Sequence, residues 1–218
     1  MISDPPAEQR PWAVLRQFVR PRPPVERCEL CGLGLAAEHP HLLEPATRQL
    51  HCCCDACSIL FSGQRQEARY RRVPPLVEWL DGFQLSDERW DDLHLPINLA
   101  FFVRSTAAGR VLAHFPSPAG ATESLLPLET WDQLARENRV LETMEPDVEA
   151  LLVNRLGESH EYYRVSIDEC YKLVGLIRTH WRGLSGGTVA WAEIVTFFAG
   201  LKQRSRPFGG APNARPEL

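Results

Sequence analysis

Cys28-Glu29-Leu30-Cys31 and Cys54-Asp55-Ala56-Cys57 are the two stretches that decide the fold of the N-terminal part of this chain. Each stretch places two cysteines three positions apart, and twenty-two residues separate the two pairs. Two thiolates at this spacing on a tight turn converge on one cation at about 2.3 Å, and two such turns complete a tetrahedron. The sequence therefore predicts a zinc site formed by Cys28, Cys31, Cys54 and Cys57.

The second half of this site holds more donor groups than one ion needs. Cys52, Cys53 and Cys54 are adjacent and His51 precedes them, so Cys52 or Cys53 could replace Cys54, and His51 could be a ligand. We favour Cys54 because it shares a turn with Cys57. Cys52 is then expected on the same side of an extended stretch as Cys54, as a thiol near the metal or a spare ligand.

The identity and role of the metal follow from the same four thiolates. A single iron ion uses the same geometry, so iron is the alternative; we favour zinc because sites of four cysteines most often hold zinc. Four protein ligands close the coordination sphere, whereas catalytic zinc keeps a position open for water. The segment is also too short to build an adequate core alone, so a structural metal would supply its folding energy.

Composition limits the class of protein. The chain has 218 residues, of which 44% are hydrophobic and 24% charged, as in folded globular proteins. A net charge of -4 argues against nucleic acid as the main partner. No apolar run is long enough for membrane insertion, and the first twenty residues lack the apolar core of a secretory signal. We therefore expect a cytoplasmic protein, in which clustered cysteines bind metal and do not form disulfides.

The pattern along the chain predicts an α+β fold. A small four-cysteine module, treble-clef-like or zinc-ribbon-like, is followed by an α+β domain with β-hairpins at 97–115 and 148–167 and two C-terminal helices. The first strand of the second hairpin could instead be helical. The expected divisions are a Pro-rich N-terminal arm at 1–27, the zinc module at 28–62, a linker with a short helix at 63–95, the α+β domain at 96–204 and a disordered tail at 205–218.

A second candidate site lies between the two C-terminal helices, for which Asp168 and Thr188 are the expected N-caps. Exposed amide groups at a helix start, together with arginine side chains, could receive an anion or a carboxylate of a partner. A plain helix–turn–helix connection with glycine at the C-cap is the alternative. The residues of this candidate are Arg178, His180, Arg182, Ser185, Gly186 and Gly187.

Several long and uncommon strings carry a family resemblance. They are ERCELCG at 26–32, the cysteine pair at 54–57, LPINLAFF at 95–102, FPSPAGATE at 115–123, EPDVEALL at 145–152 and RTHWRGLSGG at 178–187. In these strings the chain resembles an uncharacterised family of bacterial proteins, which are encoded beside actinobacterial-type, high-affinity uptake nickel–iron hydrogenases. The resemblance implies an accessory role, with a hydrogenase subunit or maturation protein as partner. It carries over no catalytic residues, and it implies thiols at Cys52 and Cys54 but not at Cys53.

Three functions are compatible with these features. The first is a zinc-binding, non-catalytic accessory protein that assists assembly or maturation of the hydrogenase by docking on a protein. The second is a rubredoxin-like electron carrier or redox sensor that holds iron in the same four thiolates. The third and most remote is a metal-dependent nuclease of the HNH type, with His39 and His41 as acids and bases, although residues 58–61 lack the histidine or asparagine ligand of that class.

Overall fold

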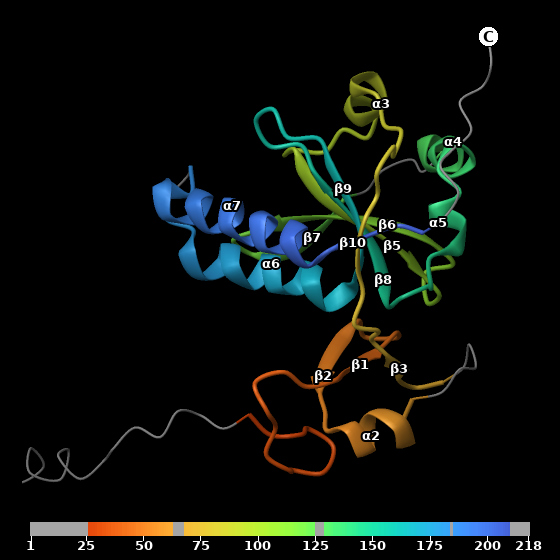
Figure 1. Ribbon diagram of the computed structural model, residues 1–218, viewed down its shortest axis with the longest axis vertical. Coiled ribbons are helices and arrows are strands. Elements are labelled where there is room, and N and C mark those ends of the chain that lie inside the picture. Colours follow the sequence, from red (N-terminus) through yellow and green to blue (C-terminus); the bar gives the residue numbers. More distant parts are fainter. Residues whose placement is uncertain (1–25, 63–67, 125–128, 184, 210–218) are drawn as a thin grey trace, which may run out of the picture.

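The computed structural model describes residues 26–62, 68–124, 129–183 and 185–209, which form a small cysteine-containing module at one end of a larger α+β domain (Figure 1). The module holds β1 (His41–Glu44), β2 (Gln49–Cys52), α2 (Asp55–Leu60) and β3 (Arg71–Arg72). The domain holds β4 (Val77–Trp79), α3 (Asp87–Asp92), β5 (Leu99–Ser105), β6 (Arg110–Ser117), β7 (Gly120–Ser124), α4 (Glu129–Glu137), α5 (Val140–Thr143), β8 (Glu149–Asn154), β9 (Glu161–Ser166), α6 (Ile167–His180), α7 (Gly187–Arg204) and β10 (Arg206–Pro207).

The domain is built on a seven-stranded sheet with the order β10-β4-β9-β8-β5-β6-β7. Its strands pair antiparallel except β10, which runs parallel to β4. The predicted hairpins are β5–β6 and β8–β9, and the predicted α+β class with two C-terminal helices is confirmed. The helical alternative for 148–156 is wrong, because β8 is a central strand whose six residues are all buried.

Both faces of this sheet are covered, which explains the continuous apolar runs in its central strands. Along β5, Leu99, Phe101 and Val103 point to the face that carries α6 and α7. The alternate residues Ala100 and Phe102 point to the opposite face, where α3, α4 and α5 pack (Figure 1). The two-residue repeat of a strand thus builds two hydrophobic cores from one run of sequence.

Two of the expected divisions differ from the structure. The expected linker at 63–95 contains the predicted short helix, α3, with Ser86 accepting a hydrogen bond from the backbone amide of Arg89. However, this stretch also supplies β3 to the module and β4 to the large sheet. The expected tail at 205–218 supplies the edge strand β10, and Phe208 packs on the second core. These strands have two or three residues, too few to show an alternating pattern in the sequence. Residues 1–25 and 210–218, which hold most of the predicted N-terminal arm and C-terminal tail, lie outside the described residues.

The N-termini of the last two helices lie close to the predicted positions but use other residues. Ser166, not Asp168, is the N-cap of α6, and Gly186, not Thr188, is the N-cap of α7. Gly186 adopts a φ of 84°, a left-handed conformation that glycine tolerates without strain. Asp168, released from the predicted capping role, instead places its carboxylate beside His41 of the module.

The module is joined to the domain by a shared core and by ion pairs. Leu43 of β1 and Val73 are buried within the same hydrophobic cluster as α6 and the sheet. Arg71 of β3 donates a hydrogen bond of 3.2 Å to Asp147, which is buried at the entrance to β8. Within the part of the chain that the structure describes, no helix has the length and apolar composition needed to cross a membrane.

Candidate metal centre

The first pair of sulfurs lies on a tight turn before β1. The backbone amide of Gly32 donates to the carbonyl oxygen of Cys28 at 2.8 Å, and the amide of Cys28 donates to the carbonyl oxygen of Leu33 at 2.8 Å. Gly32 has a φ of 77°, so the turn needs a residue that accepts the left-handed region. This turn brings the Cys28 and Cys31 thiols to the same side of the backbone.

The second pair of sulfurs lies at the start of α2. Cys54 is the N-cap residue of this helix and Cys57 lies in its first turn. Ser58, which is fully buried, donates its hydroxyl hydrogen to the carbonyl oxygen of Asp55 at 2.8 Å. The order of turn, hairpin and helix is that of a treble clef, with the second pair of thiols presented by a helix N-terminus.

The four thiols converge on one point. Their sulfur atoms all lie within 4.8 Å of one another, and the sulfurs of Cys31 and Cys54 are 3.7 Å apart. Four sulfurs at 2.3 Å from a tetrahedral zinc ion are separated by about 3.8 Å, so this spacing fits the ion. A disulfide would need about 2.05 Å, and all four cysteines are free. The four-cysteine cluster could therefore hold a metal ion in a closed tetrahedral site.

Electrostatics around the sulfurs favour a cation. Burial opposes ionisation of Cys28, but amide N–H groups of Cys54, Cys31 and Leu30 at its sulfur outweigh this effect and lower its pKa to about 6. Burial, followed by the neighbouring sulfurs, raises the pKa of Cys57 far above its usual value. Four thiolates this close repel one another, so a bound cation is what would allow all of them to be ionised.

The remaining donor groups of this segment point elsewhere. The thiol of Cys53 is fully buried and lies 3.2 Å from the carbonyl oxygen of Pro40. The imidazole Nδ1 of His51 lies 2.9 Å from Glu29, whose other carboxylate oxygen accepts the amide of Cys52 at 2.9 Å. The Cys52 thiol, expected on the side of Cys54, groups in the structure with the imidazoles of His39 and His41 and not with the four thiols.

This arrangement can be compared with known proteins. The model of a family of unknown function, DUF5947, matches residues 27–205, which include all four cysteines and nearly all of the described domain. The chain belongs to the DUF5947 family. No curated protein matches it, and neither does any solved structure. The resemblance to an uncharacterised family is confirmed for this DUF5947 protein.

The predicted site between the two C-terminal helices is a compact turn in the structure. The side chain of Trp181 covers Gly186, where an added Cβ atom would lie 2.9 Å from the indole ring. Arg182 uses its guanidinium to donate to the carbonyl oxygen of Trp181, and its backbone amide donates to Gly186. Arg178 is exposed and His180 half-buried, while Ser185 accepts a hydrogen bond from Trp191 through its carbonyl oxygen. Anion binding by this turn, including Gly187, stays a prediction.

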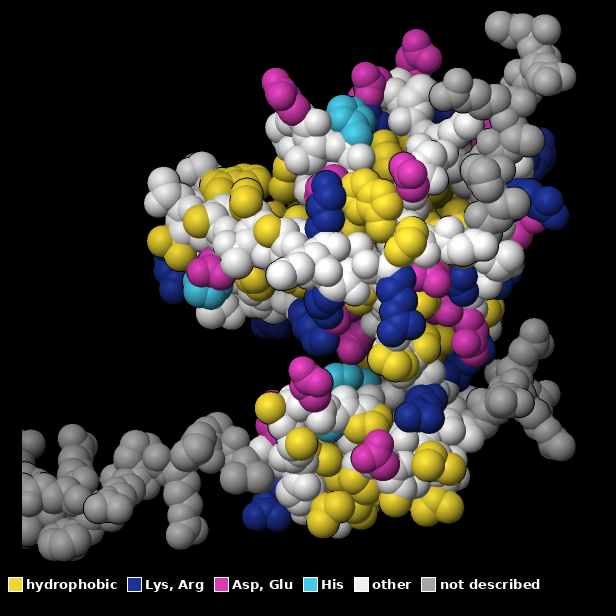
Figure 2. All heavy atoms as spheres, in the orientation of Figure 1, with side chains coloured by type: hydrophobic (Ala, Val, Ile, Leu, Met, Phe, Trp, Pro, Cys, Tyr) yellow, Lys and Arg dark blue, Asp and Glu magenta, His cyan; other side chains and the backbone are white. Residues whose placement is uncertain are grey.

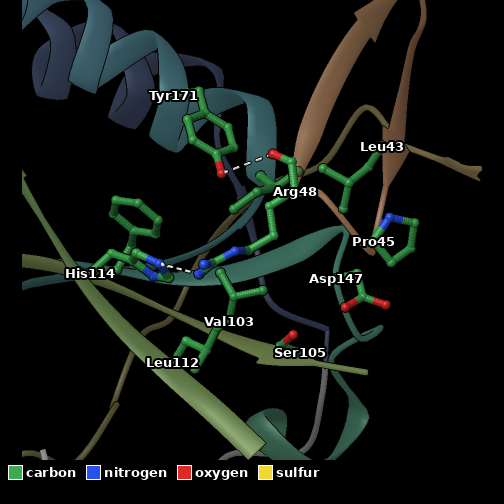
Figure 3. A pocket seen from close by; sticks show the side chains of 11 residues that line it. Leu43, Pro45, Arg48, Val103, Ser105, Leu112, His114, Asp147 and Tyr171 are labelled. Atoms are coloured by element: carbon green, nitrogen blue, oxygen red, sulfur yellow. Dashed lines mark hydrogen bonds between the residues drawn. The ribbon is translucent and has the colours of Figure 1, made fainter. Parts of the chain in front are cut away.

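A small cavity lies where the β1–β2 hairpin meets the sheet (Figure 3). Its volume is about 20 Å³, which leaves room for a single water molecule and excludes a larger ligand. Arg48 reaches across it and donates to Nε2 of His114 at 3.3 Å, while the hydroxyl of Tyr171 lies 3.5 Å from the carbonyl oxygen of Arg48. The ring of His114 stacks on Phe101 with 5.1 Å between ring centroids. This cavity is therefore a packing feature between the two units.

His114 should make stability depend on pH. Burial, with a smaller effect of the Arg48 charge, lowers its pKa from 6.5 to about 4. The unfolded chain therefore takes up the proton first, and stability that is complete above pH 6.5 is lost as the pH falls toward 4. We expect a loss of up to about 3 kcal/mol in the free energy of unfolding.

Urea unfolding between pH 7 and pH 4 tests this expectation in the wild type and in His114→Gln, which keeps a hydrogen-bond acceptor but does not titrate. The variant should show a shallower dependence on pH. His160→Gln, at an exposed histidine of the domain, is the control and should follow the wild type. Equal slopes in His114→Gln and the wild type would contradict the role of His114.

Proposed function

We propose that this DUF5947 protein is a zinc-stabilised, non-catalytic accessory protein of the cytoplasm. In this proposal it assists the assembly or maturation of an uptake nickel–iron hydrogenase by docking on a hydrogenase subunit or a maturation protein. The family resemblance supports the hydrogenase link. The four-thiol cluster supports a structural role for the metal, because four protein ligands leave no coordination position for a substrate.

The observation that carries the docking proposal is an exposed apolar surface at the end of α2. Ile59, Leu60 and Phe61, which we call the α2 apolar tip, are 65%, 76% and 50% exposed. Figure 2 shows hydrophobic side chains gathered on this end of the module, which faces away from the domain. Because the other face of α2 carries Cys57 and Ser58, which are buried, a metal at the cysteines would fix the orientation of the tip.

Three consecutive exposed apolar side chains at a helix end are costly in water, and such surfaces commonly mark sites of protein association. Their burial against a partner would contribute roughly 1.5–3 kcal/mol for each side chain that becomes fully covered. A partner with a complementary apolar groove fits this surface better than a polyanion, since the tip itself bears no charge.

Affinity purification from a host that carries such a hydrogenase tests the proposal. The tagged wild type should recover a hydrogenase subunit or a maturation protein, and the double variant Leu60→Ser/Phe61→Ser should lose it while keeping its metal content. Val189→Ser/Val195→Ser, at exposed apolar residues of α7 on the domain, is the matched control and should still recover the partner. Failure of the wild type to recover either class of protein would overturn the proposal.

A rubredoxin-like role is the second candidate, and the exposure of Cys31 favours it, because an electron could reach iron through a sulfur at the surface. Metal analysis of protein purified without added metals separates the two. A colourless protein with one stoichiometric zinc supports the structural role. A red protein with stoichiometric iron would replace it with electron transfer or redox sensing.

A further inference from the structure

A second cluster of metal-binding side chains lies on the module, apart from the four thiols. His39 and His41 flank Pro40 at the start of β1, and Cys52 is the partner of His41 across the hairpin. One ligand atom from each of the three residues lies within 4.8 Å of the other two. Nitrogen and sulfur ligands of a tetrahedral ion lie roughly 3.3–3.8 Å apart, so small side-chain rotations would bring all three onto one ion.

The geometry points to a second metal site, formed by His39, His41 and Cys52, that takes a divalent cation of the zinc, cobalt and nickel class. Two imidazoles and one thiolate form a donor set of borderline softness, which suits these ions better than magnesium or calcium. The inference goes beyond the proposed function, because it would hold even for a chain that docks on no hydrogenase component.

His39 is already oriented as a metal ligand. Its Nδ1 lies 2.9 Å from the carbonyl oxygen of Ala36, to which it donates when protonated, and this leaves Nε2 as the atom with a free lone pair. The side chain is 7% exposed, and Nε2 is buried with no hydrogen-bond partner among the described residues. A buried nitrogen without a partner costs free energy, and a bound cation would remove that cost.

The domain holds the second imidazole in place. Nδ1 of His41 lies 3.4 Å from Oδ2 of Asp168 on α6, so a carboxylate orients the ring and leaves Nε2 for the metal. An ionised carboxylate behind the imidazole also makes the ring a stronger ligand.

This site differs from the four-thiol site because three protein ligands leave one coordination position open. Both histidines and Asp168 line a cleft of about 450 Å³ between the module and the domain. Figure 2 shows histidine side chains at the top of the module, facing the hollow below the domain. The open position would face this cleft, so water or an incoming ligand could reach the ion, and the ion could exchange.

Cobalt titration of the full-length chain, with zinc already in the four-thiol site, tests the inference. The wild type should bind one equivalent of Co²⁺ with a thiolate-to-cobalt absorption band, while its zinc content stays at one. His39→Gln and His41→Gln should weaken cobalt binding at least about tenfold, and Cys52→Ser should remove the absorption band. Asp168→Asn should weaken binding by about 10- to 100-fold without removing the band. Competition with Zn²⁺ and Ni²⁺ then ranks the three ions.

His160→Gln is the control and should bind cobalt as the wild type does. Two outcomes would overturn the second site. One is a wild-type chain that holds a single metal ion at saturating cobalt, including the case in which cobalt only displaces zinc. The other is a second equivalent whose affinity and absorption band are unchanged in all three ligand variants, since that ion would lie elsewhere. If one variant fails to fold by circular dichroism, the other two decide the matter.

Discussion

Replacing Cys54 by serine is expected to remove stoichiometric metal from the four-thiol site and to unfold the module. Serine is at least as good an N-cap as cysteine, so the start of α2 keeps its capping residue, and the loss can be assigned to the sulfur. Binding of structural zinc contributes on the order of 10–16 kcal/mol in small zinc-dependent units. Apart from the cysteines, the cluster around the site contains only Leu42 and the partly buried Leu30, Leu35 and Tyr70, which is too little to keep the cysteine turn and α2 folded.

Metal analysis of the desalted protein and limited proteolysis of residues 26–62 measure this effect. Cys170→Ala is the matched control, because Cys170 is a fully buried thiol that belongs to the domain core and not to the hydrophobic cluster of the four cysteines. It should retain the metal and a protected module. A Cys54→Ser chain that keeps one tightly bound zinc, and still keeps it when His39 and His41 are also replaced by glutamine, would show that Cys52 or Cys53 can replace Cys54, and the assignment of the third ligand would be wrong.

Truncation of Phe102 to alanine is expected to cost about 3–5 kcal/mol of stability, the largest effect of any single apolar change that we predict. Phe102 is 1% exposed in the central strand β5, and its ring packs on Trp131 of α4 with 5.3 Å between centroids. Its removal leaves a cavity that flanking strands, hydrogen-bonded on both sides, cannot close. A cost of this size is a large part of the 5–15 kcal/mol that stabilises an average domain.

Urea denaturation followed by tryptophan fluorescence gives the change in free energy. Phe61→Ala is the comparison, because it deletes the same ring from a position that is 50% exposed. It should change stability by no more than about 0.5 kcal/mol. Similar losses in both variants would mean that the interior of the sheet packs less tightly than the structure indicates.

The elements that sequence predicts well are those whose signal is local. The spacing within each cysteine pair fixes a turn, and the apolar runs of β5 and β8 are long enough to identify central strands. Strands β3, β4 and β10 escape prediction because each has two or three residues and exists only through a distant partner. The strand propensity of two or three residues, summed, is too small to distinguish a short strand from an irregular connection.

The candidate sites divide along the same line. The four-thiol cluster follows from spacing, whereas the grouping of His39 and His41 with Cys52 depends on the register of a hairpin, and their contact with Asp168 depends on how α6 packs against the module. The His-Pro-His sequence followed by a strand was the only local signal for that grouping. Helix α7 is a further example of what a local pattern leaves open. Its apolar residues repeat with the period of a helix, but Val189 and Val195 are exposed because only one side of the helix packs on the sheet.

Leu43 and Val73 bury the module in the same core as the sheet, and this continuity has a consequence for the lifetime of the protein. A chain deprived of its ion would lose the turn and helix of the module, and would then uncover the apolar side of α6 that the hairpin shields. Proteases cleave such partly unfolded chains, so the amount of the protein in the cell would depend on the availability of the ion. A shortage of the metal that occupies the four-thiol site would therefore lower the amount of the protein.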